Sequence, residues 1–124
     1  MPLHDRILTD ASCYNGHLAP VEVQFGYGPV NYRDVHIGDA IDWSYAGRKT
    51  YGTPGARRVR VLGYAVSTVR TEVGAPSIGC PECGCEYPIQ IVEIENDQIV
   101  SARPARPGEE DELLKEDHEF IVDD

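Results

Sequence analysis

The sequence predicts a mainly β protein, organised as a small antiparallel sheet or half-barrel with one short C-terminal helix. Valine, isoleucine and tyrosine are prominent among the hydrophobic residues, which make up 41% of the 124-residue chain, and these side chains favour strands. Twelve glycines and nine prolines indicate many turns. The length fits one domain with a core of limited size, and a bound metal would add substantially to its stability.

Strands are expected at four places in the first half of the chain. Residues 6–9 are a short strand candidate, and alternating apolar and polar side chains over 21–25 are typical of a strand with one buried face. An Asn-Gly pair between these two segments favours a turn. Residues 31–35 can extend again, and a second alternating pattern predicts a further strand over 40–45.

The second half is expected to contain the longest strand and the clearest hairpin. Residues 46–57 combine glycines, a proline and basic side chains, which indicates an exposed loop. The β-branched stretch 58–69 predicts a long strand with a bulge or bend at Gly63. Strands over 87–95 and 98–102, joined by a two-residue Asn-Asp turn, predict a hairpin.

Residues 1–107 are expected to form the β domain, and residues 108–124 an acidic tail that can be helical. Two prolines end the sheet before this tail. A short helix is predicted over 109–118, because its acidic first turn suits the positive end of the helix dipole. Residues 120–122 are expected to add an edge strand or to serve as a docking segment.

The most informative motif is Cys80-Pro81-Glu82-Cys83, followed at once by Gly84. Two cysteines separated by two residues can direct both sulfurs at one metal ion, and the glycine allows the positive φ that such a turn needs. A loop leads into this turn over residues 72–79. The motif supplies half of a tetrahedral zinc site, so two further ligands are expected from a second turn.

Cys13 and His17 are the best candidates for the other half, because they also lie at a turn between strands. With Cys80 and Cys83 they would make a closed site of three cysteines and one histidine for a structural Zn²⁺. This pair of turns resembles the zinc-ribbon group, in which two metal-binding turns from separate hairpins share one zinc. The resemblance covers roughly residues 7–25 and 78–102, and it implies a small zinc-stabilised sheet.

Three alternatives to this site remain open at the level of sequence. Cys85 could replace His17 as the fourth ligand, or the cysteines could be reduced core residues without a metal. Two disulfides would suit a secreted protein. The start of the chain has no apolar run, so we expect no signal peptide, no membrane span and a cytoplasmic location, where paired cysteines bind metals.

Catalytic patterns are not found in the sequence, and we expect a protein that is not an enzyme. Four ligands dominated by cysteine leave no position for a reactive water. The zinc deaminase pattern requires a glutamate two residues after a histidine, and His4, His17 and His36 all lack it. A redox Cys-x-x-Cys centre normally opens a helix, whereas a strand is expected here.

Charge is distributed unevenly along the chain. Residues 108–124 carry nine acidic residues and one lysine, and hence −8 of the formal net charge of −10. We therefore expect a protein-binding module with a basic partner, such as an immunity or inhibitor protein that neutralises a toxin. The candidate partner-binding residues are Glu109, Glu110, Asp111, Glu112, Glu116 and Asp117.

A basic segment favours a second hypothesis, a nucleic-acid-binding or transcription-associated zinc ribbon. The net charge opposes this hypothesis, because phosphates would be repelled outside the basic segment. The same segment could bind a smaller anion, although it lacks the Gly-Lys-Ser/Thr ending of a phosphate-binding loop. The candidate anion-binding residues are Arg48, Lys49, Arg57 and Arg58.

Overall fold

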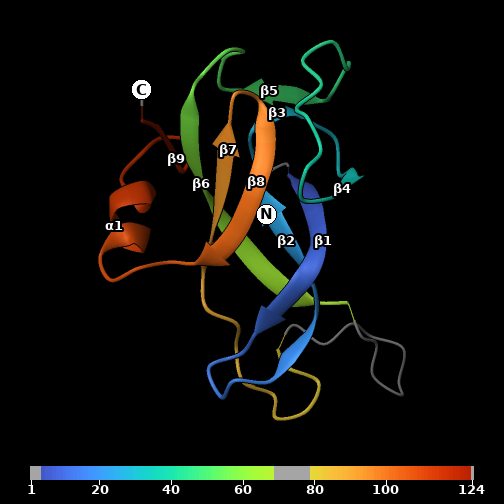
Figure 1. The fold of residues 1–124 in the computed structure, drawn as a ribbon, viewed down its shortest axis with the longest axis vertical. Coiled ribbons are helices and arrows are strands. Elements are labelled where there is room, and N and C mark those ends of the chain that lie inside the picture. Colours follow the sequence, from blue (N-terminus) through green and yellow to red (C-terminus); the bar gives the residue numbers. More distant parts are fainter. Residues whose placement is uncertain (1–3, 69–78, 124) are drawn as a thin grey trace.

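The structure is a computed structural model that describes residues 4–68 and 79–123. It is mainly β, with a curled half-barrel of mostly antiparallel strands and one short C-terminal helix, as the sequence predicts (Figure 1). The elements are β1 (Asp5–Ser12), β2 (Leu18–Phe25), β3 (Gly28–Val30), β4 (Asp34–Val35), β5 (Lys49–Tyr51), β6 (Arg58–Ser67), β7 (Gln90–Glu95), β8 (Gln98–Pro104), α1 (Glu109–Leu114) and β9 (Phe120–Val122).

The main sheet has the strand order β4-β1-β2-β6-β7-β8, and β9 is attached to β6. All of its pairs are antiparallel except β1 with β4. Strand β6 is the centre of this sheet because its first half pairs with β7 and β9, while its second half pairs with β2. Strands β3 and β5 form a separate two-stranded sheet.

The segment after β4 draws the two edges of the main sheet toward each other. The Gly38 N–H donates to the Ile99 carbonyl at 2.7 Å, and the Ile99 N–H donates to the Asp39 carbonyl at 2.9 Å. Ala40 forms an isolated bridge with Gln98 of β8. Since β4 pairs with β1 at the opposite edge, this segment connects β1 to β8 and curls the sheet.

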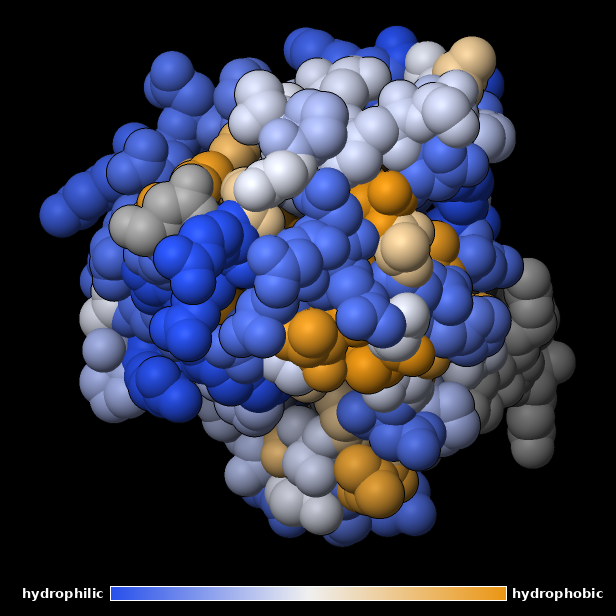
Figure 2. Space-filling view, turned by 45° about the horizontal axis from the view of Figure 1, so that its top comes forward, coloured by the Kyte–Doolittle hydropathy of each residue, from blue (hydrophilic) through white to orange (hydrophobic). Residues whose placement is uncertain are grey.

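Two apolar clusters lie on opposite faces of the curled sheet. The larger cluster fills the concave side and contains, among others, Ile7, Val23 and Ile94. The smaller cluster consists of Leu62 of β6, Ile91 of β7 and Leu113 of α1. The side chain of Leu113 thus packs the helix against the sheet. Figure 2 shows a face of the molecule on which hydrophilic residues dominate and apolar residues form separate patches.

Gly63 marks the point where β6 changes partners rather than a bulge in its pairing. It is paired with Gln90 of β7, and its successor Tyr64 is paired with Gln24 of β2. A Cβ atom at this position would lie 2.6 Å from Cγ1 of Val23 and 3.3 Å from Cγ2 of Val92. Glycine is therefore required by the close approach of neighbouring strands.

The predicted strand over 40–45 is wrong. The Asp42 side chain accepts hydrogen bonds from the Ser44 N–H at 3.1 Å and the Ser44 hydroxyl at 2.6 Å, and the Tyr45 N–H donates to the Asp42 carbonyl at 3.1 Å. These local bonds stabilise a turn and compete with a strand ladder. Trp43 instead packs edge-on against Tyr27, with ring centroids 5.5 Å apart.

Other elements differ from the predictions mainly in their lengths. The exposed loop predicted over 46–57 contains β5, and the first strand of the predicted hairpin begins at Gln90. The hairpin turn at Asn96 and Asp97 is confirmed, with φ values of 50° and 64°, as a type I′ turn requires. The loop predicted over 72–79 and the end of the 58–69 strand fall largely outside the described residues.

The predicted helix over 109–118 is shorter, because α1 ends after Leu114. Its last turn has no basic residue, and Glu116 and Asp117 follow, where negative charge opposes the helix dipole. The tail nevertheless belongs to the sheet, because β9 pairs with residues 59–61 of β6. Of the two roles expected for residues 120–122, the structure therefore shows the added strand.

Candidate metal centre

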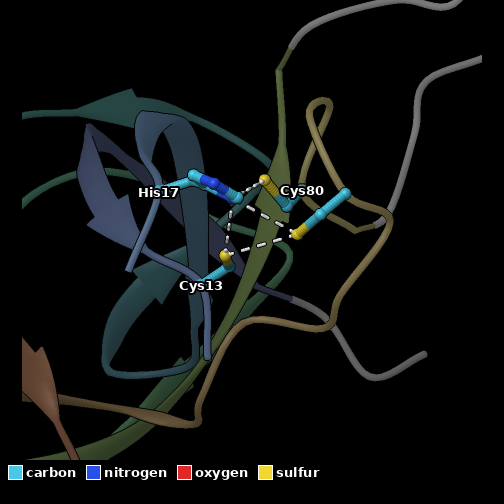
Figure 3. A group of neighbouring side chains, drawn as sticks. Cys13, His17 and Cys80 are labelled. Carbon is cyan, nitrogen blue, oxygen red and sulfur yellow. Dashed lines mark hydrogen bonds between the residues drawn. The ribbon is translucent and has the colours of Figure 1, made fainter. Parts of the chain in front are cut away.

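Cys13, His17, Cys80 and Cys83 come together although they lie in two distant parts of the chain. One ligand atom from each residue lies within 4.8 Å of all the others. The turn between β1 and β2 supplies Cys13 and His17, and the turn before β7 supplies Cys80 and Cys83. Figure 3 shows the side chains of Cys13, His17 and Cys80 pointing toward one another. The two turns lie at the end of the molecule opposite the small β3–β5 sheet (Figure 1).

The first turn is closed by its own backbone. The Gly16 N–H donates to the Cys13 carbonyl at 2.9 Å, and the Cys13 N–H donates to the His17 carbonyl at 3.1 Å. Gly16 has a φ of 83°, a conformation that glycine adopts at little cost. This geometry brings the side chains of Cys13 and His17 to the same side of the turn, with Sγ and Nδ1 3.7 Å apart.

The second turn repeats this arrangement with one additional residue. The Gly84 N–H donates to the Cys80 carbonyl at 2.8 Å, the Cys80 N–H donates to the Cys85 carbonyl at 2.8 Å, and Gly84 has a φ of 74°. The expected positive φ of Gly84 is thus confirmed. In addition, the Glu82 N–H donates to the Cys80 sulfur at 3.4 Å, and such amide donors stabilise a thiolate.

Four of the six separations between these ligand atoms fit the edges of one coordination tetrahedron, and all six lie within 4.8 Å. The Sγ atoms of Cys13 and Cys83 are 3.7 Å apart, and Nδ1 of His17 lies 3.4 Å from Sγ of Cys83 and 3.8 Å from Sγ of Cys80. A tetrahedral zinc with ordinary bond lengths has S···S edges of about 3.8 Å and S···N edges of about 3.6 Å. This group could therefore hold a metal ion, with His17 binding through Nδ1.

Each turn also supplies a supporting group for the other turn. Nε2 of His17 lies 3.6 Å from the Glu82 carboxylate, as in the carboxylate contacts that orient metal-binding histidines. The Asn15 side-chain amide donates to Sγ of Cys83 at 3.5 Å and to Sγ of Cys85 at 2.9 Å. Asn15 and Glu82 were not predicted from the sequence, because their roles depend on the juxtaposition of the two turns.

The ligand cysteines differ in exposure and in acidity. Cys13 and Cys80 are buried, whereas Cys83 is exposed. Burial raises the pKa of the Cys80 thiol. Hydrogen bonds from the Cys85 backbone N–H and from the Asn15 side chain lower the pKa of Cys83 to about 6. The thiolate is the form that binds metals, and Cys83 favours it at neutral pH.

Cys85 lies beside the cluster rather than within the group of four. Its position after the glycine of its turn matches that of His17, yet His17 is the residue that joins the group. All four cysteines are free, and the Cys13–Cys83 sulfur separation of 3.7 Å is far longer than a disulfide bond of about 2.05 Å. The structure thus brings together Cys13, His17, Cys80 and Cys83, the four residues that the sequence analysis favours as ligands.

The candidate anion-binding residues fall into two groups. The guanidinium of Arg48 lies 5.5 Å from the Tyr32 ring centroid, and Nζ of Lys49 lies 5.5 Å from that of Tyr51. Arg57 and Arg58 instead line a polar hollow of about 300 Å³ beside Glu95, Asn96 and Asp123. Arg48 and Lys49 therefore lie beside tyrosine rings, whereas Arg57 and Arg58 lie among polar and acidic side chains.

The candidate partner-binding acids also separate into two groups. The Glu109 side chain is 7% exposed, and it accepts hydrogen bonds from Arg103 at 2.7 and 2.8 Å and from Arg60 at 3.1 Å. Arg60 also pairs with Glu112 at 3.0 Å and with Asp123 at 2.7 Å. Glu109 and Glu112 thus fix the tail to the sheet. Glu112 is nevertheless exposed to solvent, as are Glu110, Asp111, Glu116 and Asp117.

Comparison with known proteins does not assign this chain to a family. No protein-family model, curated protein or solved structure matches it. Among the described residues, none of the helices combines the length and apolar character that crossing a membrane requires. A function for the chain must therefore be argued from its own residues and their geometry.

Proposed function

We propose that Cys13, His17, Cys80 and Cys83 hold a structural Zn²⁺, and that the protein is a non-catalytic module that binds a basic protein partner. An immunity or inhibitor protein that neutralises a toxin is a protein of this kind. The single observation that carries the proposal is the closed group of four donors. Three sulfurs and one imidazole suit zinc, and four protein ligands leave no position open for a substrate or a reactive water.

Zinc at this centre would join the two turns into one unit and stabilise the sheet. Structural zinc contributes on the order of 10 kcal/mol of apparent folding free energy, which is comparable to the whole stability of a domain. Chelation should therefore unfold the sheet rather than only empty a site. The β2–β6 pairing is the region most affected, because β2 begins directly after His17.

Metal content measured by mass spectrometry tests the zinc assignment. We expect one equivalent of zinc per chain and a colourless protein, since zinc has no partly filled d shell. The Cys83→Ser variant should lose most of the metal, whereas Cys85→Ser should retain it. A chain that purifies without metal and keeps its fold would refute the proposal.

The exposed part of α1 supports the partner-binding role. Leu113 and Glu109 anchor the helix, while Glu110 and Asp111 remain exposed. An acidic surface of this kind attracts basic partners over a distance and accelerates their association. The absence of a continuous apolar area in the view of Figure 2 is consistent with recognition led by charge.

Capture of a candidate basic partner, such as the product of a neighbouring gene, tests the partner-binding role. We expect a stoichiometric complex whose association slows as salt increases. A charge-reversed variant, Glu110→Lys with Asp111→Lys, should bind more weakly. Asp10→Lys with Glu86→Lys is the matched control, because both positions are exposed and lie outside the tail. Equal binding by the two variants would contradict the role of the helix.

A nucleic-acid-binding zinc ribbon is the second candidate function, and a specific observation favours it. Cationic side chains lie over tyrosine rings in three pairs: Arg33 over Tyr45 at 4.0 Å, and two looser pairs at 5.5 Å around Tyr32 and Tyr51. Basic and aromatic side chains together are typical of surfaces that bind single strands.

Filter binding at low salt decides whether this second candidate survives. Single-stranded DNA or RNA should bind at micromolar concentrations, and the complex should weaken steeply with salt. Replacing Arg48 and Lys49 by alanine, or Arg57 and Arg58 by alanine, then separates the two basic groups. If no strand binds even at low salt, the nucleic-acid function is excluded.

A further inference from the structure

A cavity of about 120 Å³ lies outside the metal centre, between the C-terminal segment and the sheet. Leu62 of β6 and Phe25 of β2 give it apolar walls, and Tyr51 and Tyr64 add aromatic rings. Residues 117–119, which connect α1 to β9, also line it. The cavity is thus formed by the same acidic tail that the proposed function assigns to partner binding.

Several polar groups of this cavity are hydrogen-bond acceptors. Oε1 of Gln24 is buried and has no hydrogen-bond partner among the described residues. Asp117 and Glu119 add two carboxylates, and the imidazoles of His4 and His118 also line the cavity, whereas no lysine or arginine of the described chain does. A buried acceptor without a donor costs free energy, so these groups favour an occupant with N–H donors and a positive charge.

Glu119 is held in an unfavourable backbone conformation at this cavity. Its φ is 59°, in the left-handed region that non-glycine residues rarely adopt. Its carbonyl accepts a hydrogen bond from the Leu62 N–H at 2.9 Å, and Oε2 accepts one from the Tyr64 hydroxyl at 2.9 Å. Strain of this kind gathers at functional sites.

The charge around Tyr64 is consistent with a site for a cation. Burial, the hydrogen bond to Glu119 and the negative charges of Glu119 and Glu110 together raise the pKa of Tyr64 to about 12. Aromatic rings attract cations to their faces, and desolvation strengthens this attraction. Carboxylates and rings together therefore select a positively charged group with an apolar stem.

The size of the cavity limits its occupant to a single side chain. Its volume of about 120 Å³ lies well below the roughly 300–1,000 Å³ of pockets for drug-sized ligands. It has room for on the order of four water molecules. A folded segment or a complete cofactor would not fit, whereas one extended side chain would.

We propose that this cavity receives the cationic side chain of a lysine or arginine presented by the basic partner protein. This inference rests on the proposed function and specifies the contact that the partner makes. The cation lies between the carboxylates of Glu119 and Asp117, donates to Oε1 of Gln24, and packs its methylene stem against Leu62. The exposed acids of α1 then attract the partner, and insertion of the side chain into the cavity fixes the orientation in which the partner binds.

Lys49 lies beside one of the aromatic rings of this cavity. Its Nζ is 5.5 Å from the centroid of the Tyr51 ring, but Lys49 does not line the cavity. Its charge repels a second cation at the same ring, so Lys49→Met should strengthen binding of the incoming side chain. This variant predicts a gain rather than a loss, which a misfolded protein could not produce.

The test is an NMR titration of the zinc-loaded full chain with small probes. The cations n-butylammonium and n-butylguanidinium represent the two side chains, while 1-butanol, butyrate and adenosine monophosphate are the neutral, anionic and nucleotide comparisons. We expect the cations to shift the amide signals of Tyr51, Tyr64 and Glu119. Glu119→Gln and Tyr51→Leu should each weaken cation binding about five- to tenfold, whereas the exposed Glu86→Gln should leave it unchanged.

Several results would overturn the inference. Equal binding of 1-butanol and the cations would show a simple apolar cavity, and stronger binding of the nucleotide would favour nucleic-acid recognition. Cation shifts confined to α1 would show a diffuse acidic surface. If a basic partner binds normally to Glu119→Gln and Tyr51→Leu, the cavity contact is wrong while the proposed function stands. If the cations bind but no basic protein partner is found, the proposed function fails while the cavity remains a cation site.

Discussion

Replacing Glu109 by glutamine should destabilise the protein by about 3 kcal/mol at neutral pH, and this penalty should disappear in acid. Hydrogen bonds from Arg103 are the main cause that lowers the pKa of Glu109 from 4.5 to about 2, and the side chain is 7% exposed. A difference of about 2.5 pKa units corresponds to roughly 3 kcal/mol of preference for the ionised form in the folded state.

The sign of the pH dependence follows from the direction of this pKa change. The folded pKa lies below the unfolded one, so the contribution of Glu109 is fully present above about pH 4.5. It is lost as the pH falls through about 2, below which the carboxyl is protonated in both states. Glutamine cannot ionise, so the difference between the two proteins should shrink over the same range.

Urea denaturation, followed through the fluorescence of the single tryptophan Trp43, measures this difference at a series of pH values. The two proteins are compared only at pH values at which both show a cooperative unfolding transition. Glu112→Gln is the matched control, because its side chain is 52% exposed and forms an ion pair with Arg60; such a pair contributes about 0–1 kcal/mol. If Glu109→Gln matches the wild type at pH 7, or if the gap persists unchanged to about pH 2.5, the reasoning is refuted.

Three further predictions concern the metal centre and the sheet. Cys80→Ser should abolish stoichiometric metal binding and unfold the sheet by circular dichroism, whereas Cys85→Ser should do neither; equal loss in both would show that Cys85 is a ligand. Glu82→Gln should lower zinc affinity about 10- to 100-fold in a chelator competition, with Glu86→Gln as the unchanged comparison. Gly63→Ala should destabilise the fold by about 1–3 kcal/mol, since its Cβ would lie 2.6 Å from a buried valine methyl; an unchanged melting temperature would contradict the close approach.

The clustering of Cys13, His17, Cys80 and Cys83 could be anticipated because it depends on short motifs. The spacing of Cys80 and Cys83, with Gly84 after them, determines one turn, and Cys13 with His17 was the best remaining pair. Spacing could not establish which of His17 and Cys85 joins the group, because both follow the glycine of their turns. The choice depends on how the two turns face each other, and only the folded chain shows this.

The failures of sequence reasoning have local and distant causes. The alternation over 40–45 imitates a strand, but the hydrogen bonds from Ser44 to Asp42 stabilise a turn instead. The acidic composition of the tail suggested that its carboxylates are available to a partner, yet the Glu109 carboxylate forms an ion pair with Arg103. That pairing depends on the path of the chain after β8, which no periodicity reveals. The cavity was also missed, because its walls come from three strands, the residue before β1 and the tail.

The pairing of β9 with the middle of the sheet has a consequence for shortened forms of the protein. Residues 120–122 pair with residues 59–61 of β6, and the adjoining Asp123 N–H donates to the Arg58 carbonyl; without them this side of β6 would face water as an open strand edge. A chain cut before Phe120 exposes that edge, and a second molecule can satisfy it by inserting its own strand. Truncated samples should therefore self-associate at high concentration, and an affinity tag is better placed at the other terminus.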